Sequence, residues 1–237
     1  CKTWPVIVDD AAPFETAVVI PVYDELDTLP ETLRSLAANA AEAVRRALVI
    51  CVVNNRIRGH GPDEAILANR ATLARLADWP RAGTHGLRLA VVDASSAGRA
   101  LPEKGGVGLA RKIGMDWAVR LFAERGAVHP AIVCLDADTQ VDASYLTAIE
   151  AWQTNRRAWG AVLRFAHPSA GPWADPVTRY EKFLRYHVLG LRHAQSPFAF
   201  HTVGSCMACT ADAYVAVAGM NQRQAGEDFY FLQKLAK

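Results

Sequence analysis

The chain has 237 residues, which is enough for one sizeable domain with a full hydrophobic core. Hydrophobic residues make up 51% of it and charged residues 21%, as in an ordinary globular protein. A formal net charge of +2 without a run of Lys or Arg argues against nucleic acid as a partner. No apolar stretch approaches the roughly 20 residues that cross a bilayer, so we expect no membrane span within this chain.

The cysteines favour a cytoplasmic location. Their number is odd, and two lie in apolar, strand-like runs, which indicates reduced and buried thiols. The five are Cys1, Cys51, Cys134, Cys206 and Cys209. The CxxC at 206–209 lacks a second pair at zinc-finger spacing, so we expect structural thiols there. The N-terminus has no signal-peptide pattern. Because it begins with Cys rather than Met, we expect a trimmed piece of a longer protein, and a membrane association through segments outside this chain stays open.

In the first half, short apolar runs alternate with helical patterns. Strands are predicted at 17–20, 47–53, 87–92 and 131–135, and Pro21 is expected to end the first. Apolar residues recur at helical spacing over 29–44, 66–76 and 109–121. This alternation predicts βαβ units. We therefore expect a single α/β domain, Rossmann-like, with a mostly parallel central sheet and helices on both faces.

After residue 142 the pattern changes. A helix over 144–155, a strand over 161–165 and a long amphipathic helix over 175–194 are predicted. This stretch carries Tyr180, Phe183, Leu184, His187 and Leu191. A further strand over 201–210, a short helix and a last helix from about residue 227 complete the chain. This second half is expected to form the opposite wall of a cleft.

Asp136 and Asp138 directly follow the apolar run 131–135. Ligands bind outside the carboxyl ends of strands in open α/β sheets, which is where these two side chains emerge. Two carboxylates at such an edge can share a hard divalent cation with phosphate oxygens. The alternative is a solvated turn, in which Asp is common. Further along the sheet, Gly105, Gly106 and Gly108 precede a helix and could let the backbone approach phosphate.

Five segments in order resemble the motifs of the family-2 glycosyltransferases, the inverting GT-A enzymes. They are 19–25 (VIPVYDE), 105–114 (GGVGLARKIG), 136–139 (DADT), 203–205 (VGS) continuing to 218–221 (AGMN), and 226–228 (GED). The resemblance covers roughly 15–235 and implies a GT-A-like fold. It implies a catalytic domain over 15–237, with a nucleotide-sugar-binding half at 15–140 and an acceptor-binding half at 141–237.

The resemblance also implies a reaction, in which a sugar moves from a nucleotide diphosphate to an acceptor hydroxyl. Asp138 is expected to bind the metal, Mn2+ or Mg2+ (manganese or magnesium), and Asp136 to contact the ribose or the metal through water. Negative charge gathers on the leaving diphosphate, and such a cation would stabilise it. Asp228 is the expected general base, and Glu227 is expected to orient the acceptor or support the loop. For this acidic pair the alternative is a favourable charge at a helix N-terminus.

The nucleotide sugar is expected to contact residues from several strand ends and from the glycine-rich helix start. They are Pro21, Tyr23, Glu25, Asn54, Asp93, Gly108, Arg111, Asp136 and Asp138. Asp93 could equally cap a turn through Ser95 and Ser96, and one of Arg111 and Lys112 is expected to be a solvated surface charge. Asn54 departs from the acidic run of the family, and because an amide can also donate, both UDP- and GDP-sugars stay open as donors. The acceptor hydroxyl, on a glycan, a lipid or a small molecule, is not predicted.

Two other functions compete with this interpretation. A sugar-phosphate nucleotidyltransferase also combines a nucleotide-binding half-sheet with metal-binding aspartates. Such enzymes carry a Gly-rich, basic loop after the first strand, whereas this chain has Pro-Val-Tyr-Asp-Glu at 21–25. The second alternative is a catalytically silent nucleotide-binding domain, and retention of Asp136, Asp138 and Asp228 argues against it.

Overall fold

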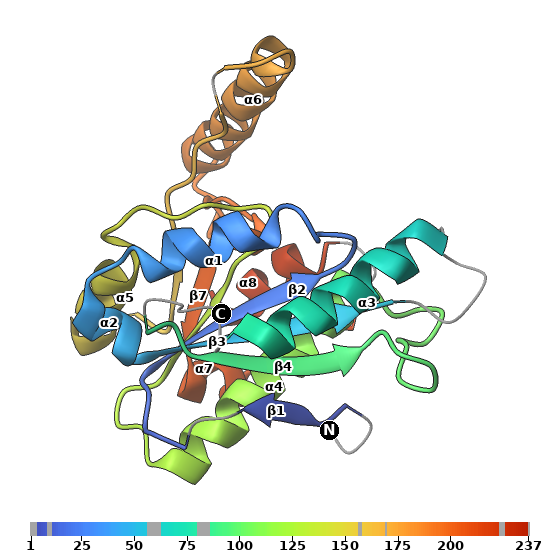
Figure 1. The fold of residues 1–237 in the computed structure, drawn as a ribbon. Helices are drawn as coiled ribbons and strands as arrows, with labels where there is room; N and C mark the ends of the chain where they lie inside the picture. Colours follow the sequence, from blue (N-terminus) through green and yellow to red (C-terminus); the bar gives the residue numbers. More distant parts are fainter. Residues whose placement is uncertain are drawn as a thin grey trace.

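A computed structural model describes residues 4–8, 11–55, 63–79, 86–155, 158–168, 170–222 and 226–236. Its centre is a seven-stranded sheet in the order β1-β4-β3-β2-β5-β7-β6 (Figure 1). The strands are β1 (Val6–Val8), β2 (Thr16–Val22), β3 (Ala47–Asn54), β4 (Leu89–Ala94), β5 (Ala131–Cys134), β6 (Gly160–Val162) and β7 (Met207–Thr210). The four central strands β4, β3, β2 and β5 are parallel, and the outer strands β1, β7 and β6 are antiparallel to their neighbours. The expected α/β fold with a mostly parallel sheet is confirmed.

Helices cover both faces of the sheet. They are α1 (Leu29–Ala37), α2 (Ala41–Arg45), α3 (Asp63–Asp78), α4 (Val107–Arg125), α5 (Tyr145–Asn155), α6 (Ala174–His193), α7 (Ala211–Ala216) and α8 (Glu227–Leu235), with a 3-10 turn η2 at Gly204–Cys206. Side chains of α4, α7 and α8 join the core on one face, and those of α1, α2 and α3 join the core on the other. Because both faces are covered, β2 and β3 are buried at every position, which explains their unbroken apolar sequences.

Several strands of the first half differ from the sequence prediction. β2 does not end at Pro21 but continues to Val22. Val19 O accepts from Leu135 N on the β5 side, and residues two apart in a strand point the same way. The missing N–H of Pro21 therefore points past the end of β5, whose pairing stops at Val19, and no ladder hydrogen bond is lost. β4 ends two residues later than predicted, at Ala94, and β1 was not predicted.

The helix predicted over 29–44 is two helices, α1 and α2. Asn39 lies at the break, where its Nδ2 donates to Ser35 O and its Oδ1 accepts from Leu146 N of α5. This tertiary contact terminates α1, and Ala40 adopts an extended ψ of 130° before α2 begins. In the second half the strand predicted over 201–210 is regular only from Met207, after the 3-10 turn, and the strand predicted over 161–165 ends at Val162.

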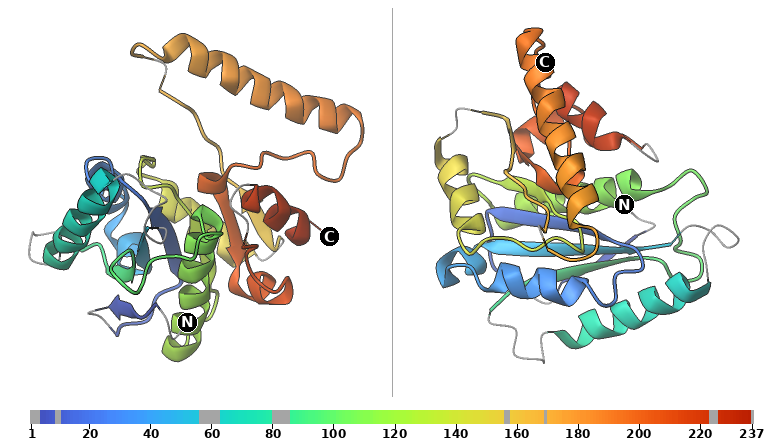
Figure 2. Two further views of the ribbon diagram at one scale, coloured as in Figure 1. Left: turned by 90° about the vertical axis from the view of Figure 1, so that its right-hand side faces the viewer. Right: turned by 90° about the horizontal axis from the view of Figure 1, so that it is seen from above.

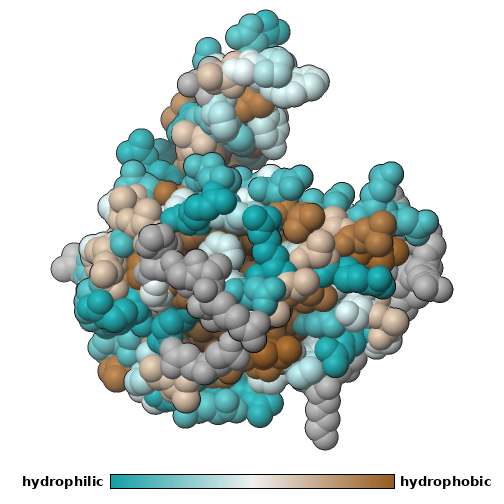
Figure 3. Space-filling view, in the orientation of Figure 1, coloured by the Kyte–Doolittle hydropathy of each residue, from teal (hydrophilic) through white to brown (hydrophobic). Residues whose placement is uncertain are grey.

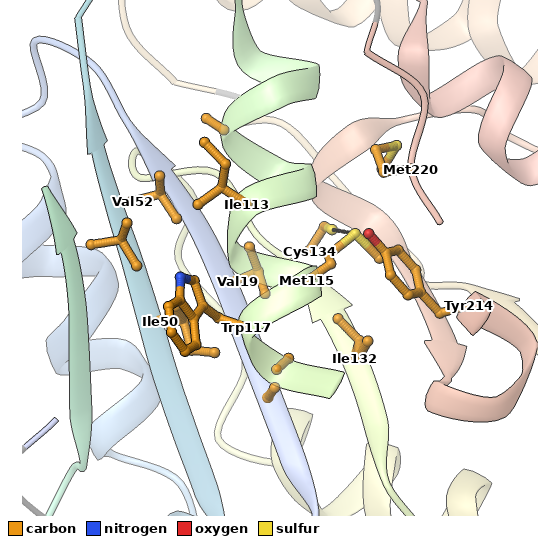
Figure 4. Close-up of a cluster of buried hydrophobic side chains, with 14 of the residues drawn as sticks. Val19, Ile50, Val52, Ile113, Met115, Trp117, Ile132, Cys134, Tyr214 and Met220 are labelled. Atoms are coloured by element: carbon orange, nitrogen blue, oxygen red, sulfur yellow. Dashed lines mark hydrogen bonds between the residues drawn. The ribbon is translucent and has the colours of Figure 1, made fainter. Parts of the chain in front are cut away.

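The core has its closest helix–sheet contact where α4 crosses β2 and β3 (Figure 4). Ile113 of α4 lies near Val19 and Val52, Trp117 lies beside Ile50, and further along the sheet Cys134 contacts Met115. The four cysteines within the described residues are free and buried, as the sequence predicts; Cys1 lies outside them. None of the described helices combines the length and apolarity needed to cross a membrane.

Gly114 permits this close contact, and replacing it with Ala is expected to lower the free energy of unfolding by about 1–3 kcal/mol. A Cβ at this position would lie 2.4 Å from Val19 Cγ1 and 3.1 Å from Val52 Cγ2. Both neighbours are in buried strands and cannot move freely. Urea unfolding of Gly114→Ala measures the effect.

Gly190→Ala is the matched control, because Gly190 is also a helical glycine and a Cβ there would meet nothing within 4 Å. It is expected to stabilise the protein by roughly 0.5–1 kcal/mol through helix propensity. Equal effects of the two substitutions would contradict the tight packing of α4.

Helix α6 stands away from the rest of the molecule (Figure 2). It confirms the long helix expected over 175–194, but Val188 is its only buried residue. Hydrogen bonds join it to the segment after β6: Arg185 donates to Phe165 O, and Glu181 accepts from His167 N at 2.9 Å. Hydrogen bonds from the His167 backbone and from Arg185 lower the pKa of Glu181 to about 2.

Candidate active site

The carboxyl ends of β2, β3, β4 and β5 lie at one edge of the sheet, because these strands are parallel neighbours. Most of the predicted nucleotide residues lie at or directly after these ends. They are Pro21, Tyr23 and Glu25 at β2, Asn54 at β3, Asp93 at β4, and Asp136 and Asp138 after β5. The topology thus brings together groups that are far apart in the sequence.

An acidic cluster forms where β2 and β5 end. Asp138 is exposed, and the Asp136 side chain is 39% exposed. Burial raises the pKa of Glu25, and the charges of Asp138, Asp24 and Asp136 raise it further. The Thr28 hydroxyl donates to Glu25 and partly offsets this repulsion.

Helix α1 holds the loop that carries the two aspartates. The buried Thr32 Oγ1 donates to Ala137 O at 2.8 Å, and Ser35 Oγ accepts from Val141 N at 3.0 Å. Both bonds fix the backbone beside the carboxylates. Asp136 and Asp138 are therefore presented from a loop with a defined conformation.

Arg111 of α4 connects the two ends of the site. Its side chain is 5% exposed, and its Nη2 lies 2.5 Å from Asp136 Oδ1. Its Nη1 donates to Glu227 Oε1 at the start of α8. Neither Arg111 nor Lys112 is the solvated surface charge that the sequence suggested, because Lys112 is half-buried and bonds both carboxylate oxygens of Asp116 at 3.0 and 3.1 Å. That expectation is wrong because α4 is covered by α7 and α8 as well as by the sheet.

The two residues of the acidic pair, Glu227 and Asp228, lie in different environments. Glu227 is 3% exposed and faces Arg111, and burial raises the pKa of Glu227 despite this ion pair. Asp228, the next residue, is half-exposed, and its Oδ1 accepts from Phe229 N at 2.7 Å. Gly226 precedes them with φ 69°, a conformation that favours glycine. The inward acid therefore anchors the first turn of α8, and the outward acid stays accessible.

Asn54 and Asp93 are largely engaged within the protein. Asn54 is buried, and its Nδ2 donates to Val22 O at 2.9 Å and to Val52 O at 3.3 Å. Both amide hydrogens are used, so only the oxygen could meet a nucleotide. Asp93 caps its turn, as the alternative interpretation proposed. Partial burial raises the pKa of Asp93, but hydrogen bonds from Ser96 and Ser95 outweigh this and lower it below the ordinary value.

The remaining predicted residues frame the same edge. Pro21 is buried in β2, whereas the Tyr23 ring is 41% exposed and is accessible for contact with a base. Gly108 lies in the first turn of α4, and Gly106 is its N-cap residue. Helix α4 has 19 residues and also carries Arg111, which pairs with Asp136. One helix therefore connects the glycine-rich segment with the acidic cluster.

Two structurally important residues were not predicted from the sequence. A Cβ on Gly204 would lie 2.5 Å from both Nη atoms of Arg111, so this glycine leaves the space that the guanidinium fills. Asn69 of α3 donates to Asn54 O and to Asn55 Oδ1 and accepts from Asp24 N, which ties together the ends of β2 and β3. The apolar spacing along α3 does not reveal Asn69, but a buried amide within a helix is a signal for such a bridge.

Within the described ranges, no three His, Cys, Asp or Glu side chains are arranged to hold a metal ion. Two carboxylates are nevertheless a sufficient protein share for Mg2+ or Mn2+ when a substrate supplies phosphate oxygens. Asp136 and Asp138 provide oxygen ligands of the right type. The donor set at this edge therefore fits a hard divalent cation shared with a diphosphate.

In an open α/β sheet, ligands bind in the crevice outside the carboxyl ends of the strands, so this edge is the candidate binding site. Comparison with protein-family models and with curated protein sequences gives no match. Among solved structures, S. aureus TarS 1-349 matches with a TM-score of 0.58 and 12% identity, over 94% of this chain and 55% of that one. The same protein in complex with UDP-GlcNAc gives 0.58 and 13%, over 94% and 53%.

M. tuberculosis glucosyl-3-phosphoglycerate synthase matches with a TM-score of 0.50 and 14% identity, over 94% of this chain and 67% of that one. The chain spans about half the length of the TarS 1-349 structures. These neighbours are GT-A-type glycosyltransferases of family 2. At such identities the likeness shows the fold, and the chain therefore has the GT-A-like fold that its motifs implied.

Proposed function

We propose that this chain transfers a sugar from a nucleotide-diphosphate sugar to an acceptor hydroxyl, with inversion at the anomeric carbon. The observation that carries the proposal is the Arg111 bridge, which joins Asp136 at the predicted donor site to Glu227, the neighbour of the predicted base. One buried cation thus links the two halves that such a reaction must align. The TarS complexes with UDP-GlcNAc and with UDP favour a UDP-sugar over a GDP-sugar.

Asp138 and Asp136 would hold a Mn2+ or Mg2+ ion in this reaction. When bound, the ion stabilises the negative charge that develops on the departing diphosphate. Asp138 is the better direct ligand, because it is exposed whereas Asp136 is already paired with Arg111. Asp136 would then contact the ribose, or the ion through water.

Protein side chains would accept the proton, orient the general base and contact the nucleobase. Asp228 accepts the proton of the acceptor hydroxyl as that oxygen attacks the anomeric carbon from the face opposite the diphosphate. The buried Glu227–Arg111 pair would hold the first turn of α8 and so keep Asp228 in one orientation. Tyr23, with its exposed ring at the end of β2, provides an apolar contact for the base.

Asp138→Ala is expected to weaken metal-dependent UDP binding at least about tenfold, since it removes a direct ligand. Calorimetric titration of UDP and of GDP, with and without Mn2+, on the wild type and the variant measures this. Asp175→Ala is the matched control, because it removes an exposed acid on α6, remote from the sheet edge. Failure of both nucleotides to bind wild-type protein with metal present would contradict the donor site.

Turnover is tested separately from binding. Release of UDP from UDP-GlcNAc or UDP-glucose, with and without a panel of hydroxyl acceptors, distinguishes a transferase from a silent binding domain. Binding without any UDP release would favour the silent domain.

A further inference from the structure

The outer surface of α6 carries large apolar side chains that nothing in the described structure covers. The exposed fractions of three of them are 62% for Phe183, 75% for Tyr186 and 58% for Leu189. These residues are spaced by three, so they form a continuous ridge along the helix. A single exposed apolar residue is ordinary, but a ridge on a helix that projects from the molecule marks an interaction surface.

The opposite side of α6 is less exposed and carries Glu181 and Arg185, which bond to the segment after β6, and this fixes the orientation of the ridge. Leu184 is half-buried and Val188 is buried. At 100° per residue, Tyr186 lies about 160° around the helix from each of them. The Arg185 guanidinium also lies 5.7 Å from the centre of the Phe165 ring, on the supporting side. The helix is therefore held by one side and presents the ridge outward.

Cations accompany the ridge. Arg179 and Lys182 are exposed and lie within one helical turn of Phe183. Over residues 164–203 the charged side chains are Arg164, Arg179, Lys182, Arg185 and Arg192 against Asp175 and Glu181, so this segment is more positive than the whole chain, whose formal net charge is +2. Figure 3 shows hydrophilic and hydrophobic residues mixed over the projecting helix.

This combination fits one kind of partner. Amphipathic helices with aromatic and basic side chains lie in the interface of a bilayer, where the rings reach the headgroup boundary and the cations meet anionic lipid. Pairing with a second copy of the chain would bring two positive segments together, and their repulsion opposes it. We propose that the outer face of α6 docks on a bilayer surface that contains anionic lipid.

Co-sedimentation with vesicles tests this docking surface. Wild-type protein is expected to sediment with vesicles of phosphatidylcholine and phosphatidylglycerol, weakly or not at all with phosphatidylcholine alone, and less as salt is added. Arg179→Gln with Lys182→Gln is expected to lower the partition coefficient at least about tenfold, because each basic residue near an anionic surface contributes to binding. Phe183→Ser with Tyr186→Ser is expected to lower it by a similar factor.

Leu67→Ser with Arg70→Gln on α3 is the matched control, since it removes an exposed apolar residue and an exposed cation from another helix. It is expected to leave vesicle binding unchanged, and circular dichroism checks that every variant is folded. Binding that survives both α6 variants, or no binding to either vesicle, overturns the proposal. A dimer in light scattering that the Phe183/Tyr186 variant dissociates, without vesicle binding, overturns it in favour of a second copy as the partner.

Discussion

Asp228→Asn is expected to lower kcat by about 10²–10⁴-fold while nucleotide binding and stability stay close to wild type. The amide cannot accept the proton of an acceptor hydroxyl, but it has nearly the shape of the carboxylate. Asp228 is half-exposed at the start of α8, and its side chain accepts a local hydrogen bond from Phe229 N. The variant should therefore have a lower kcat, with nucleotide binding and stability close to those of the wild type. Initial rates of UDP release and calorimetric UDP titration, measured on the same preparation, separate the two effects.

Glu227→Gln is the control for this experiment, since it changes the adjacent acid in the same way. Glu227 is buried against Arg111, so its loss should lower the free energy of unfolding, which Asp228→Asn should not do. A variant Asp228→Asn with wild-type turnover would place the general base elsewhere.

Much of the fold followed from the sequence because strand burial leaves a local signature. β2 and β3 are covered on both faces, and their continuous apolar runs report that directly. The aspartates after β5 were placed at the carboxyl edge by the same pattern, since parallel strands share that edge. Local sequence was sufficient wherever the structural cause is also local.

The errors have non-local causes. Residues 29–44 have continuous helical spacing, and only the hydrogen bond from Leu146 N to Asn39 Oδ1, across 107 residues, explains the break between α1 and α2. β1 was missed because its three residues, Val6–Val8, are only partly buried or exposed and gain their order from pairing with β4. No pattern within these segments contains the information that decides their structure.

The environment of Arg111 shows the same limit within the candidate site. Its partners, Asp136 and Glu227, are 25 and 116 residues away along the chain. A sign was nevertheless present: Arg111 lies three residues after Gly108 and four before Met115, both buried, so it occupies an inward row of α4. A cation on an inward row requires a buried anion, and the acidic residues of the other motifs were the candidates.

Gly204→Ala is expected to displace the Arg111 side chain without changing any charge. The added Cβ would lie 2.5 Å from Nη1 and Nη2 and 2.6 Å from Cζ, so the guanidinium must move although its partners remain. We expect a loss of about 1–3 kcal/mol in the free energy of unfolding and a lower rate of UDP release. Urea unfolding and initial rates measure both. Unchanged values for both would mean that the bridge tolerates displacement and does not align the site.

Arg111→Met is expected to lower the free energy of unfolding by about 3–5 kcal/mol, the second of the two largest effects. The substitution leaves Glu227 buried without its cation, and it removes the partner of Asp136 at the metal motif. Arg111→Lys should restore little of this stability, because a lysine ammonium cannot donate to both carboxylates with the planar geometry of a guanidinium. Urea unfolding of each variant gives the magnitudes.

The double variant Arg111→Met with Glu227→Gln separates burial of an unpaired charge from the value of the ion pair itself. Suppose that the loss of stability in Arg111→Met arises mainly because the Glu227 carboxylate stays buried without a cation. In that case the double variant should be more stable, by about 0.5–3 kcal/mol in the free energy of unfolding, than the sum of the single variants gives. Turnover should not return with stability, since the link between Asp136 and the start of α8 is still absent. Recovery of both would show that Arg111 serves the fold alone, whereas recovery of stability without turnover identifies it as the residue that aligns the donor and acceptor halves.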